Sequence, residues 1–329
     1  GCPVSAAPPS LVDHAIAVAA RPGVTVCAPG DLLRAPGARG DTLQAALARG
    51  RDVRPVYSPL DGLGLARRHP DRRVVILAVG FETTAPAAAT AILEAERLGL
   101  ANLSILCAFF RLSAAVEAVV AAPGGRAHAV LAAGPVCAVT GLGGYESIAE
   151  RFRVPAVVTG PEPVDLLDAL ARAVRQLERG TFAVENQYAR AVRPDGNPQA
   201  RAAIDAVFAP AAAHWRGLGR LPDSGLALRE PYRGFDAAAA FPEAVPPPAA
   251  APPALTECLD GEVLSGRLKP FACPAFGTRC TPGHPLGAAM VSAEGTCAAY
   301  YRHRRSPDAP APTPPLTVMP EPAPSFRGG

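Results

Sequence analysis

The sequence is almost without lysine: Lys269 is the only one in 329 residues, and arginine supplies the rest of the 32 basic side chains. A Walker-type phosphate loop is therefore excluded, because no Gly-Lys-Ser or Gly-Lys-Thr triplet exists. Schiff-base chemistry is disfavoured, since Lys269 lies between a leucine and a proline. The sequence also contains no His-Glu-x-x-His and no Gly-x-Ser-x-Gly motif, and this argues against zinc proteases and serine hydrolases that carry those motifs.

Long apolar runs and a strong charge of one sign are missing as well. The longest uncharged stretch, residues 127–145, is broken by Gly134, Pro135, Gly141 and Gly143, and no secretory pattern follows Gly1. We therefore expect a protein that does not enter a membrane and that lies in the cytoplasm. The balance of 32 basic against 29 acidic side chains is too even to argue for a nucleic-acid partner.

What the sequence does have is enough apolar content, 49%, to build cores, in a length that fits about two domains. Short β-branched runs alternate with Ala/Leu-rich runs over the first 180 residues. We expect strands at 24–27, 52–57, 74–79, 103–107, 129–133 and 156–159, and helices near 86–98, 112–121, 145–152 and 163–178. Such alternation predicts an α/β fold with two parallel-sheet, Rossmann-like domains.

Cysteine is scarce, with 8 residues, far below the content of a disulfide scaffold, but it is unevenly distributed. The last four are separated by 14, 6 and 16 residues: Cys258, Cys273, Cys280 and Cys297. Four thiolates in so short a segment suit an iron–sulfur cluster or zinc. The absence of a Cys-x-x-Cys knuckle favours the cluster, whose ligands attach to separate irons. Zinc, buried free thiols and disulfides stay open as alternatives.

These patterns divide the chain into six expected segments. We expect a first α/β domain at 1–58 that lacks its N-terminal part, a second α/β domain at 59–160, a helical or irregular return segment at 161–241, a Pro/Ala-rich linker at 242–253, an iron–sulfur cluster module at 254–304 and a disordered, Pro-rich tail at 305–329.

A second candidate site follows the most apolar predicted strand, in the stretch from Gly80 to Pro86 (GFETTAP). Open α/β sheets bind ligands at the carboxyl ends of their strands, where Glu82, Thr83 and Thr84 would lie. The carboxylate and the two hydroxyls could bind or shuttle protons, and the start of the following helix could hold an anion. The structural alternative is ordinary capping, with a threonine as N-cap.

Taken together, the motifs resemble those of the HypD family of hydrogenase maturation proteins. The resemblance rests on the cysteine array and on GCPV at the start, PGDLLRAPG (29–37), VYSPLDGL (56–63), GFETTAP (80–86), VENQYARAVRPDGN (184–197) and EGTCAAYY (294–301). These stretches occur in order from residue 1 to about residue 303, and so they cover nearly the whole chain.

The resemblance implies two α/β domains and a small domain holding a 4Fe–4S cluster, with Cys258, Cys273, Cys280 and Cys297 as its ligands. It implies a scaffold, rather than an ordinary turnover enzyme, on which Fe(II) receives CO and two cyanides for a NiFe hydrogenase. The partners would be a HypC-like chaperone and a HypE-like cyanide donor. Cys2 would bind the iron, and Glu82, Thr83 and Thr84 would line the cleft where it is built.

Four departures from the family pattern affect that cleft. Ser5, Phe109 and Pro135 stand where the family has cysteine, histidine and histidine, and we expect the family's upstream segment, with its Cys-Gly-x-His motif, to be missing. Ser5 cannot form a dithiol with Cys2. Two alternatives therefore stand beside the maturation scaffold: a diverged or truncated paralogue that binds a metal cluster without full activity, and a stand-alone iron–sulfur redox protein.

Overall fold

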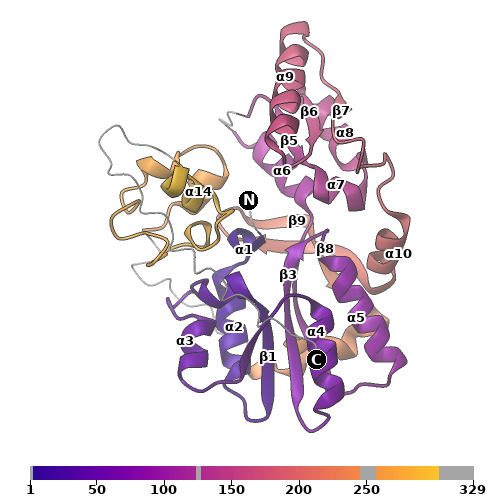
Figure 1. Cartoon of the computed structure of the whole chain (residues 1–329), viewed down its shortest axis with the longest axis vertical. Coiled ribbons are helices and arrows are strands. Elements are labelled where there is room, and N and C mark those ends of the chain that lie inside the picture. The colour runs from indigo at the N-terminus through magenta and orange to yellow at the C-terminus, as the bar shows by residue number, and fades with distance from the viewer. Residues whose placement is uncertain (1–2, 124–126, 245–256, 304–329) are drawn as a thin grey trace, which may run out of the picture.

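The computed structural model describes residues 3–123, 127–244 and 257–303, and its main framework is a six-stranded mixed sheet. The strand order is β2-β1-β3-β4-β9-β8. The four parallel strands are β1 (Val24–Pro29), β2 (Val53–Val56), β3 (Arg73–Phe81) and β4 (Leu103–Phe110). All four were expected from the sequence. This sheet and its helices form what we call the first unit, residues 3–110 and 208–244, in the lower part of Figure 1.

The continuous apolar run of β3 is explained by helices on both faces of the sheet. Side chains alternate along a strand, so that Val75 and Leu77 pack into the core beneath α2 (Pro9–Ala19). Val74 and Ile76 pack into the opposite core, beneath α4 (Pro59–Arg68) and α5 (Ala85–Arg97). Both cores are built on the strand that ends at the candidate site of residues 80–86.

The remaining two strands correct the expectation of a purely parallel sheet. β8 (Phe208–Trp215) and β9 (Gly219–Leu228) form an antiparallel hairpin, and β9 pairs antiparallel with β4. The sequence suggested only a helical or irregular return over 161–241. Ala-rich strands containing Pro210 and Pro222 have low β propensity, and this hid the hairpin.

A second unit, residues 111–207, contains a separate parallel sheet in the order β5-β6-β7 (Figure 1). Its strands are β5 (Val130–Ala133), β6 (Ala156–Thr159) and β7 (Val184–Asn186), and its helices are α6 (Leu112–Ala121), α7 (Gly134–Thr140), α8 (Gly143–Phe152), α9 (Pro163–Arg179) and α10 (Pro198–Val207). β1 and β2 therefore share a sheet with β3 and β4, and the sheets do not divide at residue 58. The chain leaves the first unit after Phe110, and α10 brings it back, because Ile204 and Val207 pack into the core beneath α5. Phe208 follows, and its ring lies 5.4 Å from that of Phe109.

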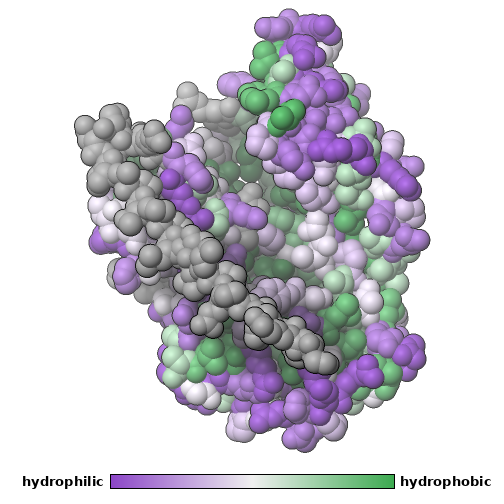
Figure 2. Space-filling view, in the orientation of Figure 1, coloured by the Kyte–Doolittle hydropathy of each residue, from purple (hydrophilic) through white to green (hydrophobic). Residues whose placement is uncertain are grey.

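α9 packs on its sheet with small residues, Ala169 and Ala173, and turns larger apolar side chains outward. Leu167 and Leu170 are 67% and 51% exposed. Hydrophobic residues accordingly gather on the upper unit in Figure 2.

A small third part, residues 257–303, which we call the cysteine module, lies beside the first unit (Figure 1). It contains α13 (Asp260–Leu264), η4 (Pro270–Ala272), η5 (Ala288–Met290) and α14 (Thr296–His303). The other short elements are α1 (Pro3–Ala6), η1 (Gly30–Arg34), α3 (Leu43–Ala48), η2 (Glu230–Phe235), α11 (Ala237–Ala240) and η3 (Pro242–Ala244).

Several expectations fall on residues outside this description: the tail at 305–329, the linker at 242–253 beyond residue 244, and Cys2. Within the three described ranges, no helix combines the length and the apolar character that crossing a bilayer requires.

Candidate functional site

The cysteine module brings all four cysteines of the predicted array around one small cavity. Cys258 precedes α13, Cys273 follows η4, Cys280 lies in a loop and Cys297 is in the first turn of α14. The cavity is otherwise lined by apolar side chains and by Asp260. Cys273 and Cys280 lie outside α-helices, and a tight loop closed by a hydrogen bond from Cys280 N to Ala275 O presents the second thiol.

No disulfide joins these thiols: the seven cysteines in the described part of the chain are all free. Burial raises the pKa of Cys258 and of Cys297 to about 12, and that of Cys280 also rises. Desolvation therefore favours the protonated form of these thiols. Over the same residues, no three His, Cys, Asp or Glu side chains converge closely enough to hold a single metal ion.

Main-chain groups already point at one of the sulfurs. The N–H of Leu286 donates to Cys280 Sγ at 3.4 Å, and Gly287 N–H also stabilises that thiolate. Gly287 packs directly on Cys258 Sγ, so that even a Cβ there would collide with the sulfur. Backbone donors and close packing of this kind orient metal-binding thiolates.

A second candidate site lies between the two units, at the end of β3. Glu82 is buried, and its two carboxylate oxygens accept hydrogen bonds from Leu112 N, the first residue of α6, at 3.1 and 3.2 Å. Burial raises the pKa of Glu82, whereas this bond and nearby Arg111 oppose the rise. The carboxylate lines a cleft of about 230 Å³ together with Arg111, Ser113, Thr140, Tyr145, Arg201 and Asp205.

Thr83 and Thr84 do not line that cleft with Glu82. Both are exposed, and Thr84 Oγ1 donates to Phe81 O at 3.0 Å. Thr84 is the N-cap residue of α5, but its side chain forms no capping bond. Its hydroxyl packs so tightly on Gly80 that a Cβ there would overlap it. The turn therefore uses Thr84 structurally, and only Glu82 of the three faces the cleft.

The sequence did not point to Cys137 and Tyr145, which lie near Glu82. Cys137 is fully buried, and the Tyr145 hydroxyl is buried without a hydrogen-bond partner in the described part of the chain. Burial and the nearby Glu82 raise the pKa of Cys137, and burial, Cys137 and Glu82 together raise the pKa of Tyr145. In the sequence, no motif distinguishes either residue from an ordinary core residue.

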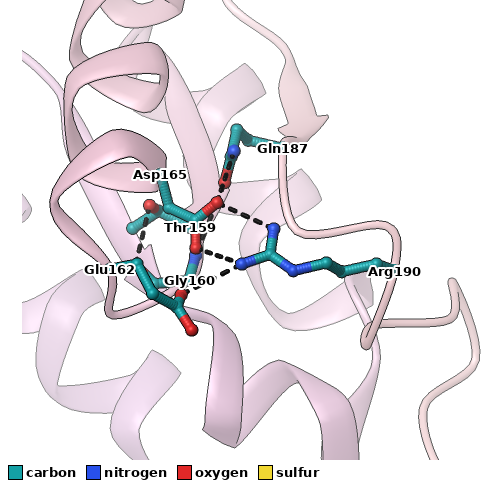
Figure 3. Close-up of polar contacts among 6 residues, drawn as sticks. All are labelled: Thr159, Gly160, Glu162, Asp165, Gln187 and Arg190. Atoms are coloured by element: carbon teal, nitrogen blue, oxygen red, sulfur yellow. Dashed lines mark hydrogen bonds and ion pairs between the residues drawn. The ribbon is translucent and has the colours of Figure 1, made fainter.

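Figure 3 shows a third polar group, at the carboxyl end of β6. Arg190 donates to both oxygens of buried Asp165 and to Glu162 at 3.0 Å, and Gln187 Nε2 donates to Asp165 at 2.9 Å. The Arg190 guanidinium holds the pKa of Asp165 well below its usual range. This network satisfies its own charges and braces the start of α9, so it is structural.

The positions that depart from the family pattern are buried or structural here. Ser5 is 4% exposed, and its hydroxyl lacks a partner among the described residues. Phe109 packs edge-on against Phe208 and pairs with Gly80 in the sheet register. Pro135 lies in the first turn of α7. Cys2 lies outside the described residues.

Comparisons with known proteins agree with the motifs. The HypD family model, described as "Hydrogenase formation hypA family", matches residues 1–304. The hydrogenase maturation factor HypD of Rhodobacter capsulatus is 45% identical over 304 residues, which cover 92% of this chain and 80% of that protein. The HypD of Rhizobium leguminosarum bv. viciae is 43% identical, with 93% and 80% covered, and that of Escherichia coli (strain K12) is 42% identical, with 93% and 81% covered.

Identity at this level over nearly the full chain, together with a family match from end to end of the described fold, shows the family directly. The chain belongs to the HypD family of hydrogenase maturation factors.

Proposed function

We propose that this chain is the scaffold on which an Fe(II) centre with CO and cyanide ligands is assembled for a NiFe hydrogenase, and that its cysteine module holds a 4Fe–4S cluster. The observation that carries the proposal is the arrangement of Cys258, Cys273, Cys280 and Cys297 around one cavity without a disulfide. Sulfur donors spaced around a cavity fit a polynuclear cluster better than one zinc ion, since each thiolate of a cluster binds its own iron.

The lining of the cavity supports the same donor chemistry. Ala275, Phe276, Leu286 and Met290 exclude water, and Leu286 N–H donates to a sulfur. When bound there, a 4Fe–4S cluster supplies or accepts single electrons. The chain's own residues hold, shield and orient that site.

The cleft between the units is where we place the iron cargo. Glu82 offers a carboxylate at the end of a central strand, next to the buried Cys137 thiol and the Tyr145 hydroxyl. Cys2 is our proposed thiolate ligand for that iron, and a HypC-like chaperone and a HypE-like cyanide donor are the proposed partners, in the cytoplasm. Thr83 and Thr84 are exposed beside the cleft and would contact cargo only from its rim.

Metal and sulfide analysis of the full chain, purified without oxygen, tests the cluster. We expect iron and acid-labile sulfide in equal amounts, and Cys273→Ala should remove the visible absorbance and most of the sulfide. Cys107→Ala is the matched control, because Cys107 lies on β4 away from the module and should leave the cluster intact. Zinc, or no metal, on the wild-type thiols would contradict the proposal.

A second reading, a diverged family member that holds a cluster without completing the iron centre, is favoured by Phe109. Its buried ring fills the place of a potential iron ligand, and carbon cannot replace imidazole in that role. Iron counting after co-production with a HypC-like protein separates the readings. Iron in excess of the cluster content supports the scaffold, and its absence supports the diverged member.

A further inference from the structure

Arg216 lies in the turn between β8 and β9 and is only 5% exposed. Its side chain donates from Nε to Ala7 O at 2.8 Å and from Nη2 to Pro36 O at 3.0 Å. Its own N–H donates to Ala6 O at 2.8 Å. The guanidinium thus ties the hairpin turn to the segment after α1 and to the loop after η1, through neutral acceptors.

The next residue brings this buried cation against the cysteine module. Gly217 has φ +78°, and a Cβ there would lie 2.5 Å from the Cα of Gly261 in α13. A Cβ on Gly261 would in turn lie 2.6 Å from Gly217 O. The two backbones can meet only because both residues are glycine. Arg216 therefore lies next to the residues that immediately precede Gly261, among them Asp260 and Cys258.

Both side-chain hydrogen bonds of Arg216 go to neutral carbonyl oxygens, and no carboxylate in the described part of the chain forms an ion pair with it. The acidic groups whose fields reach it are Asp260 and Cys258 on the module side and Asp13 on α2. Asp13 already accepts from Ala38 N at 2.9 Å. Because the surroundings are buried, the field of the guanidinium at the four-cysteine cavity is only weakly screened.

We propose that Arg216 is a positioning residue that raises the reduction potential of the four-cysteine site, and this rests on the cluster assignment proposed above. Four thiolates make the site negative in both oxidation states. When an external low-potential reductant adds one electron, the site gains one more negative charge. A fixed cation favours that reduced form, and the Asp260 carboxylate opposes it.

Redox titration of the full chain with dithionite and mediator dyes tests this, after iron and sulfide have been measured for each variant. Arg216→Gln keeps hydrogen-bond donors but loses the charge, and its midpoint potential should be more negative than that of the wild type at equal iron and sulfide content. Arg216→Lys restores the charge and should return the potential towards the wild-type value. An unchanged potential in fully loaded R216Q would overturn the proposal.

Arg34→Gln is the matched control, since Arg34 also ties the module to the first unit. Its Nη2 donates to Pro282 O at 3.2 Å and to Val291 O at 3.1 Å, and Arg34 is absent from the lining of the cysteine cavity. R34Q should have the midpoint potential of the wild type. If R34Q shifted the potential as much as R216Q does, the shift would come from loosened packing of the cysteine module on the first unit, and the proposal would be refuted.

If R216Q does not retain a cluster, Asp260→Asn keeps the proposal falsifiable. Removal of the opposing carboxylate should move the midpoint potential to more positive values, whereas R216Q should move it to more negative values. A general disturbance of the module would not shift the potential in opposite directions in the two variants. A D260N potential equal to or below that of the wild type would refute the proposal. Wild-type protein without iron and sulfide would instead refute the cluster assignment itself.

Discussion

At the residue scale, two buried polar side chains, Glu82 in the cleft and Ser5 outside it, differ in whether their polar atoms have hydrogen-bond partners. Ser5 and Glu82 are 4% and 7% exposed. The hydroxyl of Ser5 lies in an apolar groove with Phe81 and Trp215, whereas the carboxylate of Glu82 accepts from the first N–H of α6. The first is an unpaired dipole, and the second is a paired but desolvated charge. Substitutions of Ser5 and of Glu82 are therefore expected to change the stability of the protein in different ways.

We expect Ser5→Cys to stabilise the protein by about 1 kcal/mol, because a thiol tolerates burial without a partner better than a hydroxyl does. Urea unfolding under reducing conditions measures the change. Ser224→Cys is the control: Ser224 Oγ accepts from Trp215 Nε1 at 2.9 Å and donates to Leu221 O at 2.8 Å, so that its loss should destabilise. Destabilisation by S5C would show that the hydroxyl is satisfied.

We expect the Glu82→Gln variant to lose no more than about 1 kcal/mol of unfolding free energy at pH 7, and a gain is equally compatible with its structure. The substitution removes a buried charge but keeps an acceptor for Leu112 N. The raised native pKa of Glu82 means that its contribution to stability is greatest below the ordinary carboxyl pKa and is lost as the pH rises. Iron bound by a complex with a HypC-like protein should nevertheless fall.

Glu82→Ala separates these effects, since it removes the acceptor as well and should cost about 1 kcal/mol in thermal or urea unfolding. If E82Q bound iron as the wild type does, the carboxylate would have only its capping role. Glu82→Gln thus tests whether the carboxylate is needed for iron binding, and Glu82→Ala tests how much its hydrogen bond to Leu112 N stabilises the fold.

At the element scale, the sequence predicted those strands and helices whose local signals agree with their surroundings. The apolar run at 74–79 is an example, and the structure contains a strand there, β3. The place of the β8–β9 hairpin in this sheet could not be predicted, because the pairing of β9 with β4 is a contact across more than a hundred residues of chain. Tyr145 became a cleft residue for the same reason.

The start of α9 gives a prediction on pH. Arg190 holds the pKa of Asp165 below its usual range, so this carboxylate stabilises the fold above about pH 4, the ordinary aspartate value, and the contribution is lost as the pH falls towards the lowered native pKa. We expect Asp165→Asn to reduce stability at pH 7 and to flatten its decline between about pH 6 and pH 3.

Urea unfolding of the metal-free chain across that pH range measures the effect. Asp168→Asn is the control on the same helix, because Asp168 is partly exposed and pairs with Arg172 at 3.1 Å. If the unfolding free energy of D165N fell with decreasing pH as steeply as that of the wild type, the network of Figure 3 would not be a cause of acid unfolding.

At the scale of the whole molecule, the cysteine array was readable from spacing alone, whereas its place beside the first unit was not. The residues that fix that place are unremarkable in sequence: an arginine among many and two glycines far apart in the chain. Gly217 and Gly261 meet only in the folded protein. Composition and periodicity carry no signal for such a contact.

We expect Gly217→Ala to separate the module from the first unit, because the added methyl group would overlap α13. Limited proteolysis should then cleave the cysteine module, residues 257–303, faster than in the wild type. Gly219→Ala shares the same φ of +78° but has open space around its Cβ position, so it reports the backbone strain alone, about 1 kcal/mol. Equal cleavage in the two variants would contradict a packing role for Gly217.

The chain departs from the first unit and re-enters it at nearly the same spot, where the rings of Phe109 and Phe208 touch. The second unit is thus an insertion in the sequence of the first, with its entry and exit side by side. Ile204 and Val207 of α10 also pack into the core built on β3 and α5, so the insertion is joined to its host by buried apolar surface as well as by the two connections.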